Sequence, residues 1–289
     1  MIDWPEKLIE VISRRRCVVM IGSGVSQNSK NDAGKRPASW EEFLKNQLNE
    51  FDDDGLVNQL IAKKDLLSAC EVIKEKLTPD NFCFNVQQEY QNAGYKPAKI
   101  HEHVYNLDTS IVATPNFDVI YDTYAQKVSR GTIKIKSHNS EDIANYIHGG
   151  QHRLLIKTHG SANDPTNIIF TRRDYAEART KYIFFYEILK ALALTHTFLF
   201  IGCGIEDPDI RMLFEDIQFA HTHLPHHYMT IPEGENHVDL IKICKRDMKI
   251  NFLEYSSAKG HLELTNSLEK LVESVEKYRT DQLLSTQRW

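Results

Sequence analysis

The chain lacks the paired cysteine spacing of zinc ribbons and of thioredoxin-like redox sites. Five cysteines occur among its 289 residues, and no two of them form a C-x-x-C pair. They are Cys17, Cys70, Cys83, Cys203 and Cys244. An odd number of scattered cysteines is typical of a reducing compartment, so we expect a cytoplasmic location and no structural zinc.

Long apolar runs and an excess of positive charge are missing as well. No run approaches 18 apolar residues, and no apolar signal region follows the first residue, so we expect neither secretion nor a membrane span. Lysine and arginine total 35 against 40 aspartates and glutamates, a formal net charge of −5. Because nucleic-acid-binding domains are usually basic, we do not expect direct binding of nucleic acid.

Histidine groups with the spacing of metal ligands are not found either. His101 and His103 stand two apart, so on a helix they face different directions. The histidines within residues 221–227 have no cysteine or carboxylate partner at ligand spacing. We therefore expect no metal site.

Internal repeats, low-complexity tracts and a clear interdomain linker are also absent. We expect a single domain over residues 1–289. Its core is predicted at about 1–38 and 107–289, and an all-helical insertion at about 39–106, where apolar residues recur at helix spacing without a strand signal. The polar segment before the insertion, Gln27–Ala38, is expected to be a mobile flap.

Short apolar runs bounded by turn signals predict the strands of the core. The runs at 17–21 and 197–201 are apolar almost throughout, which is typical of strands buried on both faces of a parallel sheet. We predict an α/β fold of Rossmann-like type, a parallel sheet with helices on both faces. The expected strands are residues 17–21, 110–114, 133–135, 154–158, 168–171, 197–201, 227–230 and 250–255.

A glycine turn follows the first strand directly. It reads Gly22-Ser23-Gly24-Val25-Ser26. Glycine lets a ligand come close to the backbone, and Ser23 and Ser26 add hydroxyl groups. The pattern indicates a phosphate-binding loop, and the alternative is an ordinary strand-to-helix turn.

Polar side chains follow two of the later strands. Asn116 and Asp118 come after strand 110–114, and His159 with Gly160 comes after strand 154–158. Because ligands bind at the carboxyl ends of strands in open parallel sheets, we favour one shared site. The alternatives are a helix cap for Asn116 or Asp118 and a structural role for His159.

A second glycine loop, Gly202-Cys203-Gly204, follows the apolar strand 197–201. Its glycines again permit the close approach of a ligand. Asp207 and Asp209 come next in the chain. Either of them can cap the following helix.

Taken in order, four stretches resemble the sirtuin NAD-binding fold. They are Gly22–Ser26, Thr114-Pro115-Asn116-Phe117-Asp118, Thr158-His159-Gly160 and Gly202-Cys203-Gly204. Sirtuins carry a Gly-Ala-Gly-x-Ser loop, a Gln-Asn-x-Asp stretch, a His-Gly pair and a late glycine loop in this order. The missing zinc ribbon and the missing Gly-Ile-Pro-x-Phe-Arg pattern depart from sirtuin deacylases. They resemble instead the sirtuin-like NAD-hydrolysing domains of bacterial antiphage defence, where a helical insertion replaces the zinc module.

The resemblance implies an NAD glycohydrolase that depletes NAD as a defence effector. His159 would act as the base, since imidazole has an ordinary pKa of about 6.5, and Asn116 would orient ribose or water. Asp118 would hold the nicotinamide amide or a neighbouring loop. Asp207 or Asp209 would bond a ribose hydroxyl, or simply cap the helix. The NAD-binding residues implied are Gly22, Ser23, Gly24, Ser26, Asn116, Asp118, Gly160, Gly202, Gly204, Asp207 and Asp209.

Partners also follow from the resemblance. Some relatives are small proteins paired with a HerA-type hexameric ATPase, and an NAD hydrolase needs gating, so we expect a homo-oligomer and such an ATPase partner. Two other functions stay open: an NAD-dependent protein deacylase, and a non-catalytic subunit that senses NAD or ADP-ribose.

Overall fold

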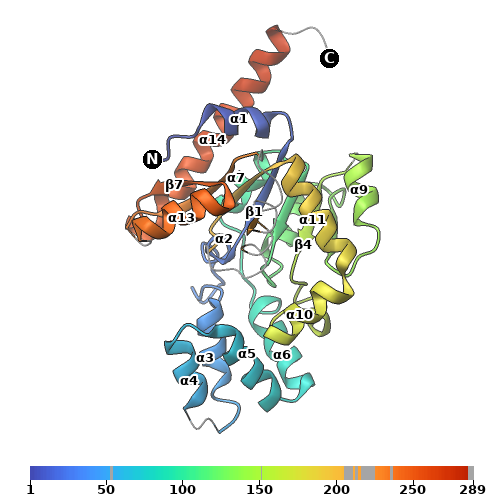
Figure 1. The fold of residues 1–289 in the computed structure, drawn as a ribbon, viewed down its shortest axis with the longest axis vertical. Helices are drawn as coiled ribbons and strands as arrows, with labels where there is room; N and C mark the ends of the chain where they lie inside the picture. The colour runs from blue at the N-terminus through green and yellow to red at the C-terminus, as the bar shows by residue number, and fades with distance from the viewer. Residues whose placement is uncertain are drawn as a thin grey trace.

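One parallel sheet forms the centre of the molecule (Figure 1). The structure is a computed structural model that describes residues 1–52, 55–150, 152–204, 211, 214–215, 225–234 and 237–285, with the backbone alone for 283–285. The strands in these residues are β1 (Cys17–Ile21), β2 (Ile111–Thr114), β3 (Lys134–Ser137), β4 (Leu154–Lys157), β5 (Thr197–Ile201), β6 (His227–Pro232) and β7 (Ile250–Tyr255). They follow the order β3-β4-β2-β1-β5-β6-β7, and every neighbouring pair is parallel.

The middle strand, β1, is enclosed on all sides. All five residues of β1 and all five of β5 are buried. Val19 pairs in register with Val112 of β2 and with Leu199 of β5. A strand with neighbours on both sides and helices on both faces needs a continuous apolar run, which Cys17–Ile21 supplies. The carboxyl ends of β1, β2, β4 and β5 therefore meet at one edge of the sheet.

Helices cover both faces of the sheet, which confirms the predicted α/β, Rossmann-like fold. One face packs against α1 (Glu6–Ser13), α7 (Lys99–Asn106), α8 (Ile120–Val128) and α14 (Ala258–Ser285). The other face packs against α9 (Ile143–Gly149), α10 (Arg172–Lys181), α11 (Ile183–Thr195) and α13 (Val238–Met248). In Figure 1 the last turns of α14 extend beyond the rest of the chain. None of the helices in the described part of the chain is long and apolar enough to cross a membrane.

Four helices between β1 and β2 form a group of their own at one end of the sheet (Figure 1). They are α3 (Trp40–Gln47), α4 (Leu56–Ala62), α5 (Leu66–Lys76) and α6 (Pro79–Tyr90), and we call them the helical block. A capping box of Ser39 and Glu42 starts α3. The block has its own apolar core, which takes in Phe170 and Phe117 from loops that follow the sheet strands. The inserted helix α7 packs on the sheet instead, because Ile100 and Val104 face it.

The loop between β4 and α10 departs from the predicted strands. Residues 168–171 form no strand, although Ile168, Ile169 and Phe170 are buried. Their side chains alternate between two cores: Ile168 and Phe170 enter the helical block, and Ile169 enters the core over the sheet. This apolar run thus contributes side chains to two cores, and it pairs with none of the described strands. Two further short elements in the described residues are α2 (Ser23–Ser26) after β1 and η1 (Pro165–Asn167) within this loop.

Candidate active site

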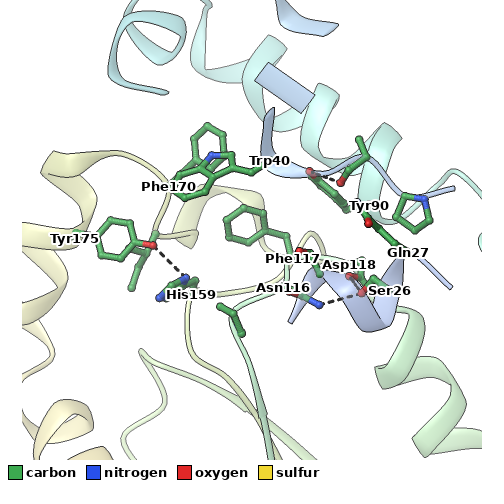
Figure 2. A pocket seen from close by; sticks show the side chains of 15 residues that line it. Ser26, Gln27, Trp40, Tyr90, Asn116, Phe117, Asp118, His159, Phe170 and Tyr175 are labelled. Carbon is green, nitrogen blue, oxygen red and sulfur yellow. Dashed lines mark hydrogen bonds between the residues drawn. The ribbon is translucent and has the colours of Figure 1, made fainter. Parts of the chain in front are cut away.

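A cavity of about 120 Å³ lies between the carboxyl edge of the sheet and the helical block (Figure 2). Polar groups from the strand ends line one side of it, and aromatic rings line the other. Five of the residues that the sequence places in the site border this cavity. They are Ser23, Ser26, Asn116, Asp118 and His159.

The polar side is ordered by a chain of hydrogen bonds. The Ser26 hydroxyl donates to Asp118 Oδ2 at 2.6 Å, and Asn116 Nδ2 donates to Ser26 Oγ at 2.9 Å (Figure 2). A hydroxyl has one proton, and Ser26 uses that proton in its hydrogen bond to Asp118. The Ser26 oxygen can therefore only accept from Asn116, which identifies the contacting end of the Asn116 amide as its NH₂ group. The amide oxygen of Asn116 is then the atom that this side chain can offer to a ligand. Such an acceptor suits the hydroxyl of a sugar or a water molecule.

Asp118 has its carboxylate bonded inside the protein. Its side chain is buried, Oδ2 accepts from Ser26, and Oδ1 accepts from the backbone N–H of Ile120 at 3.1 Å in the first turn of α8. Two roles were predicted for Asp118, binding the nicotinamide amide and holding a neighbouring loop, and these bonds are of the second kind. Contact of Asp118 with nicotinamide remains a prediction.

His159 comes from the turn after β4. It is buried, and its Nδ1 lies 3.4 Å from the hydroxyl of Tyr175 at the start of α10 (Figure 2). The two rings meet edge to face, with centroids 5.1 Å apart. Gly160 makes this turn possible, because its φ is +88° and a Cβ atom would lie 2.7 Å from the carbonyl oxygen of Asn167. The role of Gly160 in the structure is thus to turn the chain behind His159.

The aromatic side of the cavity was not predicted. Phe170 lies with its ring centroid 6.2 Å from Trp40 and 5.8 Å from Phe117, and Phe117 lies 6.0 Å from Tyr90. Two of these rings belong to the helical block and two to loops of the sheet. Their sequence positions are far apart, so only the fold brings them together. Flat apolar walls of this kind suit a planar ring as ligand.

A buried ion pair behind the cavity was also missed. Lys157, the last residue of β4, has 1% of its side chain exposed, and its Nζ lies 3.2 Å from Asp122 Oδ1 on α8. Burial raises the pKa of Asp122. The nearby charge of Lys157 acts in the opposite direction, and that of Asp118 raises the pKa further. One signal was present in the sequence: a lysine ends an apolar strand directly before Thr158-His159.

The glycines of the two loops do not line the cavity, and the two loops pack against each other. Gly24 N–H donates to the carbonyl oxygen of Gly202 at 3.0 Å, and Gly22 N–H donates to that of Ile201 at 3.0 Å. A Cβ atom on Gly22 would lie 2.3 Å from the Gly202 oxygen. These glycines are required by close packing, and contact of Gly22, Gly24 and Gly202 with NAD remains a prediction. Gly204 is exposed, and Asp207 and Asp209 lie outside the described residues.

The segment Gln27–Ala38, predicted to be a mobile flap, is fastened to α6 by Glu89. Glu89 Oε1 accepts from the backbone N–H of Ala38 at 2.8 Å, and Oε2 accepts from Lys35 Nζ at 2.6 Å. Tyr95 adds a bond of 2.6 Å to Oε1. Because Gln27, Pro37 and Ala38 line the cavity, Glu89 holds one of its walls in place.

In the part of the chain that the structure describes, no group of three or more His, Cys, Asp or Glu side chains is placed to bind a metal ion. His101 and His103 are both buried on α7. His221 and His223 of the histidine-rich segment lie outside the described residues.

A comparison with known families identifies the family to which the chain belongs. The model of the SIR2-like domain matches residues 110–255, half of the chain. The chain belongs to the SIR2-like family. The matched region runs from β2 to β7 and so includes the loops of Asn116 and His159. It confirms the sirtuin-like assignment, and it leaves the first glycine loop and the helical block outside the match.

Two curated relatives carry informative names. Defense-associated sirtuin 2 of Bacillus subtilis is 28% identical over 157 residues, which cover 52% of this chain and 15% of that protein. The NAD(+) hydrolase ThsA of Enterococcus faecium is 23% identical over 218 residues, which cover 74% of this chain and 42% of that protein. The SIR2-like chain thus spans less than half the length of either relative.

Proposed function

We propose that this SIR2-like chain is an NAD glycohydrolase that cleaves NAD to nicotinamide and ADP-ribose. One observation carries the proposal: Asn116 and His159, from two different strand ends, border the same cavity. The relative named NAD(+) hydrolase supports the reaction class. A site for binding alone would not need both an imidazole and an aimed amide oxygen.

The cavity suits the reacting end of the substrate. Sites that enclose a whole small ligand measure roughly 300–1,000 Å³. The cavity of about 120 Å³ is sized for one ring and part of a sugar. Its aromatic wall of Trp40, Phe117 and Phe170 offers stacking for a nicotinamide ring. The remainder of NAD would extend toward the exposed Ser23 and the first glycine loop.

The chemistry assigns one task to each polar residue. The bond between C1′ of ribose and the nicotinamide nitrogen breaks, and its electron pair goes to nicotinamide. A water oxygen bonds C1′, which passes through a sugar cation as in glycoside hydrolysis. His159 takes the proton from that water, or from a ribose hydroxyl, and releases it to solvent. Asn116 orients the attacking water or the ribose through its amide oxygen.

The biological role in the proposal is depletion of NAD in defence against phage. The relative named defense-associated sirtuin supports a role in defence. An ungated hydrolase would kill its own host, so we propose that it acts in the cytoplasm as a homo-oligomer under the control of a HerA-type ATPase. No zinc is required by this reaction.

The test is a product assay on the purified chain with NAD, alone and with a candidate ATPase. We expect nicotinamide and ADP-ribose in equal amounts without any acyl-lysine peptide. The variants His159→Ala and Asn116→Ala should each lower the turnover number by at least about a hundredfold, the scale of losing a positioned acid–base or orienting group. Circular dichroism checks that both variants fold.

Three outcomes decide against the proposal. Nicotinamide release that needs an acyl-lysine peptide would favour a deacylase. Binding of NAD without release under every condition would favour a sensing subunit. Near-normal turnover in His159→Ala would remove the base from the mechanism.

A further inference from the structure

Lys157 and Asp122 form an ion pair behind the cavity, and the structure gives it a place in the site. Their side chains are 1% and 5% exposed, and Nζ and Oδ1 are 3.2 Å apart. Lys157 Nζ also donates to the backbone carbonyl oxygen of Asp118 at 2.6 Å. Neither side chain lines the cavity, so neither is expected to touch a ligand.

Stability alone does not account for such a pair. Moving two charges out of water costs several kcal/mol per ion, and apolar side chains of similar volume often give equal or better stability. The pair therefore calls for an explanation in terms of geometry. That explanation lies in what the ammonium group connects.

The Lys157 ammonium joins three elements at one point. It stands at the end of β4, two residues before His159. Its acceptor, the Asp118 carbonyl, lies in the loop two residues after Asn116, and Asp122 lies on α8. One buried cation thus connects the Asn116 loop and α8 to the strand that precedes His159.

The other bonds made by the backbone of the Asn116 loop, residues 115–119, join neutral groups. The carbonyl oxygen of Phe117 accepts from Ala162 N–H at 2.8 Å, and Val119 N–H donates to the Tyr90 oxygen at 3.3 Å. Asn116 N–H donates to Thr114 Oγ1 at 3.1 Å. A charge-assisted bond is about twice as strong as a neutral one. The Asp118 carboxylate makes such bonds with Ser26 and with Ile120 N–H, but neither of them comes from β4. The bond from Lys157 is therefore the charge-assisted one that connects the loop to the strand before His159.

We propose that Lys157, paired with Asp122, is a positioning residue that fixes the Asn116 loop against the His159 turn. This rests on the proposed NAD glycohydrolase function for its kinetic consequence, whereas its structural consequence does not. A displacement of about 1 Å in an orienting group costs roughly a hundredfold in rate. Loss of the pair should therefore act on turnover more than on substrate binding.

The experiment replaces both charges at once by the apolar pair Lys157→Met with Asp122→Leu. We expect this variant to fold, because neither charge is left buried alone. Its unfolding transition should be lowered only by the loss of the bond to the Asp118 carbonyl, about 1–3 kcal/mol. The turnover number should fall by about a hundredfold, and KM should change less than about threefold. Hydrogen exchange of the loop amides of Asn116, Val119 and Ile120 should accelerate at least about tenfold.

A matched control comes from the neighbouring strand. Lys136 on β3 forms a partly exposed ion pair with Asp142 at 2.6 Å, and it touches neither the Asn116 loop nor the cavity. Lys136→Met should leave turnover within about twofold and the loop exchange unchanged, because exposed pairs contribute little.

The exchange measurement needs no substrate, so it separates this inference from the proposed function. If the wild type cleaves no NAD, the proposed function fails, and faster exchange in the apolar pair still supports the positioning role. Unchanged exchange, or unchanged turnover in a folded variant, overturns it. Should the apolar pair not fold, Lys157→Gln with Asp122→Asn carries the same test. Failure of both to fold would make the pair a determinant of stability and also overturn the inference.

Discussion

Two halves of the same sheet edge use their loops in different ways. The loops after β1 and β5 carry glycines, and they pack backbone against backbone, with Gly24 N–H bonded to the Gly202 oxygen. The loops after β2 and β4 carry Asn116 and His159, and they border the cavity. In the first half the residue types are set by lack of space, and in the second half by the chemistry of polar groups.

The difference predicts how substitutions in the two halves will behave. Changes at the glycines that follow β1, β5 and β6 should alter the free energy of unfolding and leave the turnover of the molecules that remain folded unchanged. Changes in the β2–β4 half should alter turnover. Ser26 connects the halves, because it follows the first glycine loop but bonds Asp118 and Asn116.

The largest effect is expected from Gly202→Ala. Gly202 has a φ of +63°, and a Cβ atom would lie 2.7 Å from the Val25 nitrogen. A non-glycine residue at such a φ costs about 1–2 kcal/mol, and overpacking costs about 1–3 kcal/mol more. We expect a loss of about 3 kcal/mol in the free energy of unfolding, measured by urea denaturation.

Two other glycines separate strain from crowding. Gly234→Ala has the strain without the crowding, since φ is +75° and no atom lies within 4 Å of the added Cβ. Gly22→Ala has the crowding without the strain, since its φ is −102° and the Cβ would lie 2.3 Å from the Gly202 oxygen. Close packing predicts that Gly22→Ala costs more than Gly234→Ala. The reverse order would contradict the account of the glycine loops.

The next effect is expected at Ser26, where the halves meet. Ser26→Ala removes the acceptor of the Asn116 amide and the donor to the Asp118 carboxylate. Asn116 then loses its fixed orientation, and we expect the turnover number for NAD cleavage to fall by about 10- to 100-fold. Asp118 Oδ2 loses its donor while Oδ1 keeps the bond from Ile120 N–H, and this loss should also lower the free energy of unfolding by about 1–3 kcal/mol.

Ser29 provides the control for that variant. It is a fully buried serine three residues further on, and its hydroxyl has no hydrogen-bond partner among the described residues. Ser29→Ala should leave both turnover and stability nearly unchanged. Equal losses in the two variants would show that the Ser26 hydroxyl has no special role in aiming Asn116.

The fold was largely predictable because it depends on local patterns. Continuous apolar runs such as 17–21 and 197–201 identify strands buried on both faces, whatever surrounds them. The run 168–171 has the same composition and is not a strand, since its side chains serve two cores that the sequence does not reveal. Periodicity shows that a residue is buried, but it does not show against what.

The polar half of the site was predictable for a similar reason. Asn116 and His159 follow strands directly, and parallel strands place their carboxyl ends together. Trp40 and Tyr90 reach the cavity only through the packing of the helical block on Phe117 and Phe170. The buried role of Lys157 was not predicted, although the sequence shows a charged residue at the end of a strand that we expected to be buried.

The smallest expected effect is the pH dependence contributed by His227, a buried histidine in the structural half. Its ring packs edge to face against Phe198 and Phe214, and its Nδ1 accepts the backbone N–H of Phe198 at 3.0 Å. Burial lowers the pKa of His227 to about 3, helped by the nearby charge of His226. This histidine is therefore neutral in the folded protein over the whole range in which an exposed one takes up a proton.

The unfolded chain binds a proton at His227 below a pH of about 6.5, and the folded chain does not until a pH near 3. Stability from this group is thus complete above about 6.5 and is lost as the pH falls, by about 1.4 kcal/mol at pH 5.5. His227→Gln keeps an acceptor for Phe198 N–H and does not titrate, so we expect its stability to fall less than that of the wild type between pH 7.5 and 5.5. Turnover of the folded His227→Gln protein should equal that of the wild type, because His227 does not line the cavity. Identical pH profiles of stability for the wild type and His227→Gln would contradict the prediction, because they would mean that His227 binds its proton equally in the folded and unfolded states.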